Sequence, residues 1–179
     1  MLNTQKLKFR EQEVPYVGHV LTESGLEASP DKVRAICNMP RPGNMGDVRR
    51  FVGTANYLAR FLPALSDTLE PLHQLTNKDI AWQWNEEQEQ AFCKLKEALA
   101  VAPVLRYFDK DIHPTVQCDA SQTGLGAVLL QQDQPVSYAS RRLTGTEERY
   151  AQIEKELLAI VFALKKFDQY THMGGQSQL

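Results

Sequence analysis

Residues 114–140 read PTVQCDASQTGLGAVLLQQDQPVSYAS, and this stretch decides the fold. Its apolar and β-branched runs are separated by small and polar residues that are typical of turns. The runs predict strands at Pro114–Cys118, Gly126–Gln131 and Pro135–Ala139. Three strands in succession, followed by a helix, are how an α/β domain begins.

A long helix is predicted directly after these strands, from Thr146 to about Tyr170. Apolar residues recur at intervals of three and four positions throughout this segment. The stripe that they form predicts the face with which the helix covers the sheet. Its members are Tyr150, Ile153, Leu157, Ile160, Val161, Leu164 and Phe167.

The N-terminal part of the chain is predicted to be mostly helical. Residues 14–21 are rich in Val and Tyr and lead into a turn at 22–25, which predicts one strand. Capping residues that precede apolar periodicities then predict three short helices separated by prolines. The capping residues are Ser29, Asn44 and Ser66. The second of these helices is expected to extend to about Phe61.

A short strand and a further helix are predicted in the centre of the chain. Trp82 and Trp84 alternate with polar residues, as in a strand. Asn85 and the two glutamates after it are typical of the first turn of a helix. Pro103 is expected to end that helix.

The change from helical to strand patterns predicts a split near residues 104–110. We expect a region of small helices over 1–103 and an α/β region over 104–179. A three-stranded sheet with one covering helix, of about seventy residues, is near the lower size limit for independent folding. The second region is therefore expected to be part of a larger, truncated domain.

The charge balance argues against a dedicated nucleic-acid binder, because the formal net charge is −2 and the pI is near 6.1. Any contact with nucleic acid is then expected to come from local basic patches. The candidates are Arg49–Arg50, Lys94 with Lys96, Arg141–Arg142 and Lys165–Lys166. Such pairs also occur commonly as solvated surface charges.

Three cysteines that are far apart in the sequence, Cys37, Cys93 and Cys118, do not suggest a disulfide framework. This pattern favours a reducing, intracellular compartment. The sequence contains no apolar run of signal-peptide length and no stretch of eighteen apolar residues. We therefore expect neither a secretory signal nor a membrane span.

Asp119 is the most suggestive carboxylate. Residues alternate between the two faces of a strand, so Gln117 and Asp119 are expected on the face opposite Cys118. Asp119 lies at the end of its strand and is followed by small residues, which leave room for a ligand or a metal ion. The alternative is that Asp119 starts a turn through hydrogen bonds of its own side chain.

The predicted long helix offers two partners for Asp119. Glu156 and Glu154 lie on opposite edges of its apolar stripe, and periodicity does not choose between them. Either could equally be a solvated charge. Carboxylates that converge from a strand and a helix would suit Mg²⁺. Two such ions support in-line phosphoryl transfer, which usually needs more than two carboxylates.

Five short motifs follow one another along the chain. They are Tyr16–Val20 (YVGHV), Arg50–Gly53 (RFVG), Pro103–Leu105 (PVL), Cys118–Ser121 (CDAS) and Glu154–Val161 (EKELLAIV). In order and spacing they resemble the polyproteins of gypsy-class LTR retrotransposons. The resemblance runs from the end of the reverse transcriptase into the first part of its ribonuclease H domain.

This resemblance implies an α+β fold, with the end of the palm, the thumb and the connection over residues 1–103. A truncated ribonuclease H-like sheet with a long covering helix would follow over 104–179. The implied family functions are RNA-directed DNA synthesis and Mg²⁺-dependent cleavage of RNA in RNA–DNA hybrids. Asp119 matches the first catalytic and metal-binding aspartate, and Glu156 matches the glutamate on the helix, whereas Glu154 matches no catalytic position.

The resemblance also implies partners: an RNA–DNA hybrid or duplex, and the other portions of a parent polyprotein. The candidate nucleic-acid contacts are Arg49, Arg60, Arg141 and Arg142. The polymerase aspartates of the family would lie upstream of this chain, and two of its four ribonuclease H carboxylates have no counterpart here. We therefore expect no catalysis by the isolated chain. The alternatives are a nucleic-acid-binding module without catalysis and a protein-interaction module.

Overall fold

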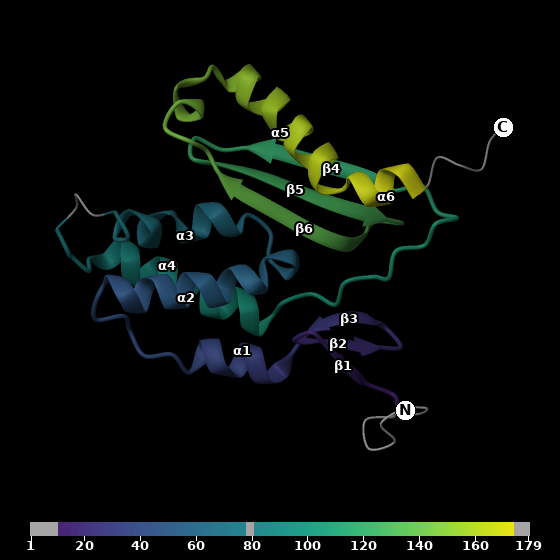
Figure 1. Ribbon diagram of the computed structural model, residues 1–179, viewed down its shortest axis with the longest axis horizontal. Helices are drawn as coiled ribbons and strands as arrows, with labels where there is room; N and C mark the ends of the chain where they lie inside the picture. The colour runs from purple at the N-terminus through teal and green to yellow at the C-terminus, as the bar shows by residue number, and fades with distance from the viewer. Residues whose placement is uncertain (1–10, 78–80, 174–179) are drawn as a thin grey trace, which may run out of the picture.

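Two three-stranded antiparallel sheets lie on either side of a group of helices in this computed structural model, which describes residues 11–77 and 81–173 (Figure 1). The first sheet contains β1 (Val14–Tyr16), β2 (His19–Thr22) and β3 (Gly25–Ala28). The second sheet contains β4 (Thr115–Ala120), β5 (Gly124–Gln131) and β6 (Gln134–Arg142). Each sheet follows chain order, so hairpins connect its strands.

The helices fall into two groups. The first comprises α1 (Pro30–Cys37), α2 (Met45–Tyr57), the 3₁₀ turn η2 (Ala59–Phe61), α3 (Leu65–Gln74) and α4 (Glu86–Ala100). The second comprises the 3₁₀ turn η3 (Glu147–Arg149), α5 (Gln152–Lys166) and α6 (Asp168–Met173). Across the part of the chain that the structure describes, no helix has the length and hydrophobicity that crossing a bilayer requires.

The predicted starts of α2 and α4 are confirmed, whereas α3 begins at Leu65 with Ala64, not Ser66, as its N-cap. Asn44 Oδ1 accepts a hydrogen bond from the backbone N of Asp47 at 3.0 Å, so Asn44 caps α2. Gln88 Oε1 accepts from the backbone N of Asn85 at 3.0 Å at the start of α4. Between these caps, the apolar faces of α1 to α4 form one core, whose largest fully buried side chains include Phe51 and Phe61.

The second sheet is the middle layer of three; the covering helix was predicted from the sequence, and the packing of α3 and η2 on the other face was not. Helix α5 packs on one face of β4 and β5, while α3 and η2 pack on the other face, against β5 and β6 (Figure 1). In the register Cys118 pairs with Ala127 and Asp119 pairs with Gly126. Cys118 and Ala127 belong to the core beneath α5, so Asp119 is on the opposite face.

Two predictions about strands were wrong. Residues 14–21 form two strands rather than one, because Val17 and Gly18 adopt positive φ angles of 44° and 72° and make a tight hairpin turn. Valine is an unusual residue for such a turn, so the sequence carries no signal for it. The second error is the predicted strand at Trp82 and Trp84. No strand forms at 81–85, and the Trp84 ring instead packs edge-on against Phe92.

The helix predicted over 146–170 lies in the expected part of the chain, but it is not continuous, and the face that it buries is not the predicted one. It is divided into η3, α5 and α6. Of the predicted stripe only Phe167 is buried, and Leu157 is 57% exposed. The residues of α5 that face the sheet are Lys155, Ala159 and Ala163. Small alanine side chains let the helix approach the sheet closely, whereas periodicity reports only which residues share a face.

Because the large apolar residues of α5 point outward, replacing one of them should destabilise the fold less than enlarging a small residue on the inner face. Replacing Leu157 with Gln should change the free energy of unfolding by no more than about 0.5 kcal/mol, because this side chain is already in water. Replacing the fully buried Ala159 with Leu should destabilise the fold by about 1–3 kcal/mol through overpacking. Urea unfolding of both variants measures this, and the opposite ranking would mean that the helix packs with its large residues inward.

A second prediction concerns acid stability. Arg141 donates to both carboxylate oxygens of Glu147, at 2.8 and 2.9 Å, and Thr144 N donates to the same carboxylate. The hydrogen bond from Arg141, with the help of Thr144, lowers the pKa of Glu147 from 4.5 to about 2. Since the folded-state pKa is the lower one, this contribution to stability is present above about pH 4.5 and is lost as the pH falls towards 2.

Glu147→Gln should therefore flatten the loss of stability between about pH 4.5 and 2. Thermal unfolding at a series of pH values tests this, with Glu87→Gln on the exposed side of α4 as the control. An unchanged acid profile in Glu147→Gln would show that this ion pair does not contribute to folding.

Candidate active site

Asp119 is the centre of the candidate site. It is the second-last residue of β4, its side chain is exposed, and Gly126 opposite it leaves space above the strand. The neighbouring residues Cys118 and Ala120 face the opposite side and pack beneath α5. The sequence-based prediction of the two strand faces is therefore confirmed.

A cavity of about 290 Å³ borders Asp119. One wall is the second sheet, with Gln117 and Tyr138 on the same face as Asp119. The other wall is the start of α3 and the residues before it, including Pro63 and Asp67. The cavity therefore forms only where the helical region meets the sheet, and two carboxylates, one from each region, line it.

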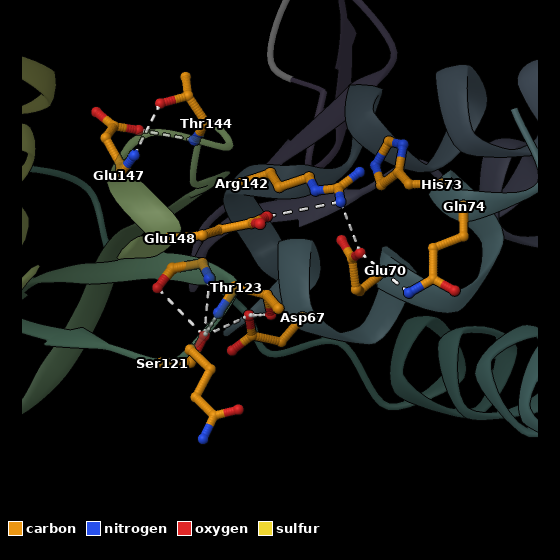
Figure 2. Close-up of polar contacts among 12 residues, drawn as sticks. Asp67, Glu70, His73, Gln74, Ser121, Thr123, Arg142, Thr144, Glu147 and Glu148 are labelled. Atoms are coloured by element: carbon orange, nitrogen blue, oxygen red, sulfur yellow. Dashed lines mark hydrogen bonds and ion pairs between the residues drawn. The ribbon is translucent and has the colours of Figure 1, made fainter. Parts of the chain in front are cut away.

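The turn after β4 is held in place by the helical region. Ser121 Oγ donates to Asp67 Oδ1 at 2.8 Å and accepts from the backbone N of Gly124, also at 2.8 Å (Figure 2). A Cβ atom on Gly124 would lie 2.9 Å from Ser66 Oγ, so a larger residue would not fit between this turn and α3. Asp67 therefore fixes the turn two residues beyond Asp119, a role that the sequence did not reveal.

The start of α5 lies beside the end of β4. Gln152 Nε2 donates to the carbonyl oxygen of Ala120 at 2.9 Å, and the buried Lys155 donates to that of Gln122 at 3.2 Å. Glu156 follows Lys155 and is exposed rather than half buried. The Glu154 carboxylate accepts from the backbone N of Ala151 at 2.8 Å and so caps the helix. Glu154 thus has a structural role, whereas the Glu156 carboxylate has no hydrogen-bond or ion-pair partner among the residues that the structure describes.

The residues present do not fit a complete two-metal site. Residues 11–77 and 81–173 contain no group of three or more Asp, Glu, His or Cys side chains that could hold a metal ion. Asp119 and Glu156 together offer oxygen ligands of the kind that Mg²⁺ prefers, but two carboxylates are fewer than a pair of divalent ions requires. These two residues alone therefore do not supply the ligands that a two-metal cleavage step needs.

The four predicted nucleic-acid contacts are in different electrostatic settings. Arg141 is paired with Glu147, and Arg142 lies 2.8 Å from Glu70 and 3.7 Å from Glu148 (Figure 2). Much of the charge of these two is thus offset. Arg49 is exposed and donates to the carbonyl oxygen of Thr76 at 3.2 Å. The Nε atom of Arg60 is buried and has no hydrogen-bond partner in the described parts of the chain.

Known proteins share both the sequence pattern and the fold. Curated relatives include the Tf2-3 and Tf2-4 transposon polyproteins of Schizosaccharomyces pombe, each 33% identical over 175 residues. The match covers 95% of this chain and 13% of each polyprotein, so the chain spans about one eighth of their length. The predicted resemblance to retrotransposon polyproteins is confirmed.

Solved structures of the foamy viral protease-reverse transcriptase have the same fold. The one in complex with an RNA/DNA hybrid superimposes with a TM-score of 0.83 at 24% identity, covering 96% of this chain and 24% of that protein. The one in complex with double-stranded DNA has a TM-score of 0.76 at 25% identity, covering 90% of this chain and 35% of that protein. The predicted α+β architecture is confirmed.

A family model described as an RNase H-like domain found in reverse transcriptase matches residues 84–177, which is more than half of the chain. The match contains β4 to β6, α5 and Asp119, whereas the wall of the candidate site that includes Pro63 and Asp67 lies before it. This chain belongs to the family of RNase H-like domains found in reverse transcriptases.

Proposed function

We propose that this chain is the part of a retroelement polyprotein in which the end of the reverse transcriptase, residues 1–103, meets the ribonuclease H domain, residues 104–179. The proposed activity of the whole protein is DNA synthesis on RNA and cleavage of the RNA strand of RNA–DNA hybrids. The observation that carries this proposal is the exposed Asp119 carboxylate beside a cavity, at the end of a strand in an RNase H-like sheet. The foamy viral relative bound to a hybrid supports the choice of substrate.

In this proposal Asp119 and Glu156 contribute carboxylate ligands for Mg²⁺. Because they do not make a complete site, the further ligands would come from other parts of a longer polyprotein, of which the relatives provide examples. Catalytic groups of this kind act as a unit, and losing part of the set removes most of the rate. We therefore propose that this stretch by itself binds hybrids without cleaving them.

A role in protein interaction is the second candidate, and the exposed side of α5 favours it. Leu157, Ile160 and Leu164 are each about half exposed on one helix face. Apolar side chains gathered in this way commonly mark a surface that another protein segment covers. Sedimentation of the chain at increasing concentrations tests this role, since a monomer at all concentrations would argue against self-association.

The cleavage test uses a labelled RNA–DNA hybrid with Mg²⁺ and compares the chain with its Asp119→Asn variant. We expect no cleavage by either protein, because the ligand set is incomplete. The wild-type chain should nevertheless bind the hybrid, with an affinity that falls as salt rises. Cleavage by the wild type that Asp119→Asn abolishes would show that two carboxylates suffice and would overturn the proposed division of the site.

A binding test probes the location of the site without requiring activity. In EDTA, the Asp119 carboxylate should repel the phosphates of a hybrid held at the cavity. Asp119→Asn should then tighten hybrid binding by about twofold to fivefold. Asp133→Asn is the matched control, because Asp133 lies in the β5–β6 turn with a φ of 60°, which Asn also tolerates. Equal effects of the two substitutions, or none from Asp119→Asn, would place the hybrid elsewhere.

A further inference from the structure

A second cavity, of about 380 Å³, follows the free edge of the second sheet. It runs along β6, an edge strand that lies on the opposite side of the sheet from β4 and Asp119. The end of α2 and η2 form one of its walls, and the junction of α5 and α6 forms the other. We call it the edge groove, defined by Arg60, residues 137–140 of β6, and Lys166.

The edge groove is positively charged. Arg60 lines it from the side of η2 and Lys166 lines it from the end of α5, while its described lining contains no Asp or Glu. Neither cation has a carboxylate partner within 4 Å among residues 11–77 and 81–173, unlike Arg141 and Arg142. Arg60 Nε also has no hydrogen-bond partner among these residues. Two cations without an ion-pair partner within 4 Å among the described residues therefore line one groove from opposite sides, and Asp168 is the acidic residue that lies between the lining residues Phe167 and Gln169 in the sequence.

Two further basic side chains, His19 and Lys32, lie near the Arg60 side of the groove. His19 is the nearby titratable group, and burial, together with the charge of Arg60, lowers the pKa of its imidazole. His19 is therefore neutral at pH 7. Lys32 Nζ lies 5.9 Å from the centre of the Tyr57 ring, which lines the groove, so a further cation is close.

The other lining residues supply neutral donors and aromatic rings. Asn56 and Gln169 contribute amides, and Tyr138 and Tyr170 contribute aromatic rings and hydroxyl groups, although the Tyr170 ring also packs against Phe108. The third tyrosine, Tyr57, is already engaged, because its hydroxyl donates to the Val17 carbonyl oxygen and its ring stacks on His19. Guanidinium, ammonium and neutral donors are the groups that usually contact phosphate and sugar, and aromatic rings stack on bases. The combination of positive charge, donors and rings is suited to a nucleic-acid strand.

We propose that the edge groove holds the phosphodiester backbone of the bound nucleic acid, with Arg60 and Lys166 contacting phosphates from its two sides. This inference rests on the proposed function, which requires nucleic acid, and adds the place where the strand is held. It distinguishes Lys166 from its neighbour Lys165. Both lysines line the adjacent pocket beside Arg141 and Leu158, but only Lys166 also lines the edge groove.

The test measures binding of a fluorescent RNA–DNA hybrid by anisotropy over a range of salt concentrations. Lys166→Gln and Arg60→Gln should each weaken binding severalfold and reduce the slope of log K against log salt by about 0.9, the value for one lost phosphate contact. Lys165→Gln, one residue away on the same helix, should leave affinity and slope unchanged. Thermal melts check that each variant is folded. Arg60 is partly buried, so its substitution can affect folding; Lys166→Glu, at an exposed position, reverses the charge and gives a second, stronger variant.

The outcomes separate this inference from the proposed function. If the wild type binds in a salt-dependent way but Lys165→Gln and Lys166→Gln give equal slopes of log K against log salt, only the proposal about the edge groove is overturned. Absence of salt-dependent binding by the wild type would overturn the proposed nucleic-acid function and this inference together. Poly-glutamate and unlabelled hybrid can be compared as competitors at the same charge concentration. If poly-glutamate competes as effectively as the hybrid, the groove takes acidic peptide, and the phosphodiester assignment is overturned.

Discussion

The close approach of α3 to the β4–β5 turn is the contact on which the arrangement of the two regions depends. Gly124 has no side chain to separate them, so Asp67 can accept hydrogen bonds from the hydroxyl groups of Ser121 and Thr123 (Figure 2). The backbone N of Ser66 donates to Ser140 Oγ at 3.1 Å on the same face of the sheet. These hydrogen bonds join the start of α3 to both the β4–β5 turn and β6, so they help to fix the position of the helical region on the sheet.

This contact creates both surfaces to which we assign function. It encloses the cavity beside Asp119, and it leaves β6 at a free edge between η2 on one side and the α5–α6 junction on the other. It also explains why basic residues that look alike in the sequence differ in the fold. Arg142 meets Glu70 of α3 across the contact and has part of its charge neutralised there, whereas Arg60 and Lys166 meet no carboxylate among the described residues.

Helix α5 covers the sheet with a narrow face of small residues and leaves a broader face of larger apolar residues exposed. Ala159 and Ala163 pack on the sheet, and the larger Leu157 and Leu164 point outward. An apolar stripe on a helix normally lies against a core. In this chain, which matches only 13% of the length of the Tf2 polyproteins, the larger stripe is exposed.

The sequence by itself determined the strands of the second sheet, the capped starts of α2 and α4, and the two faces of β4, because alternation, periodicity and capping act over a few residues. It also identified Asp119 and, through resemblance, preferred Glu156. Only the tertiary structure showed that Lys155 and the alanines of α5 face the sheet, that Asp67 holds the turn after β4, and that Arg60 and Lys166 face one groove. These pairings join residues that are 33 positions apart for Lys155 and Gln122, 54 for Asp67 and Ser121, and 106 for Arg60 and Lys166. Local patterns carry no information about which distant surfaces meet.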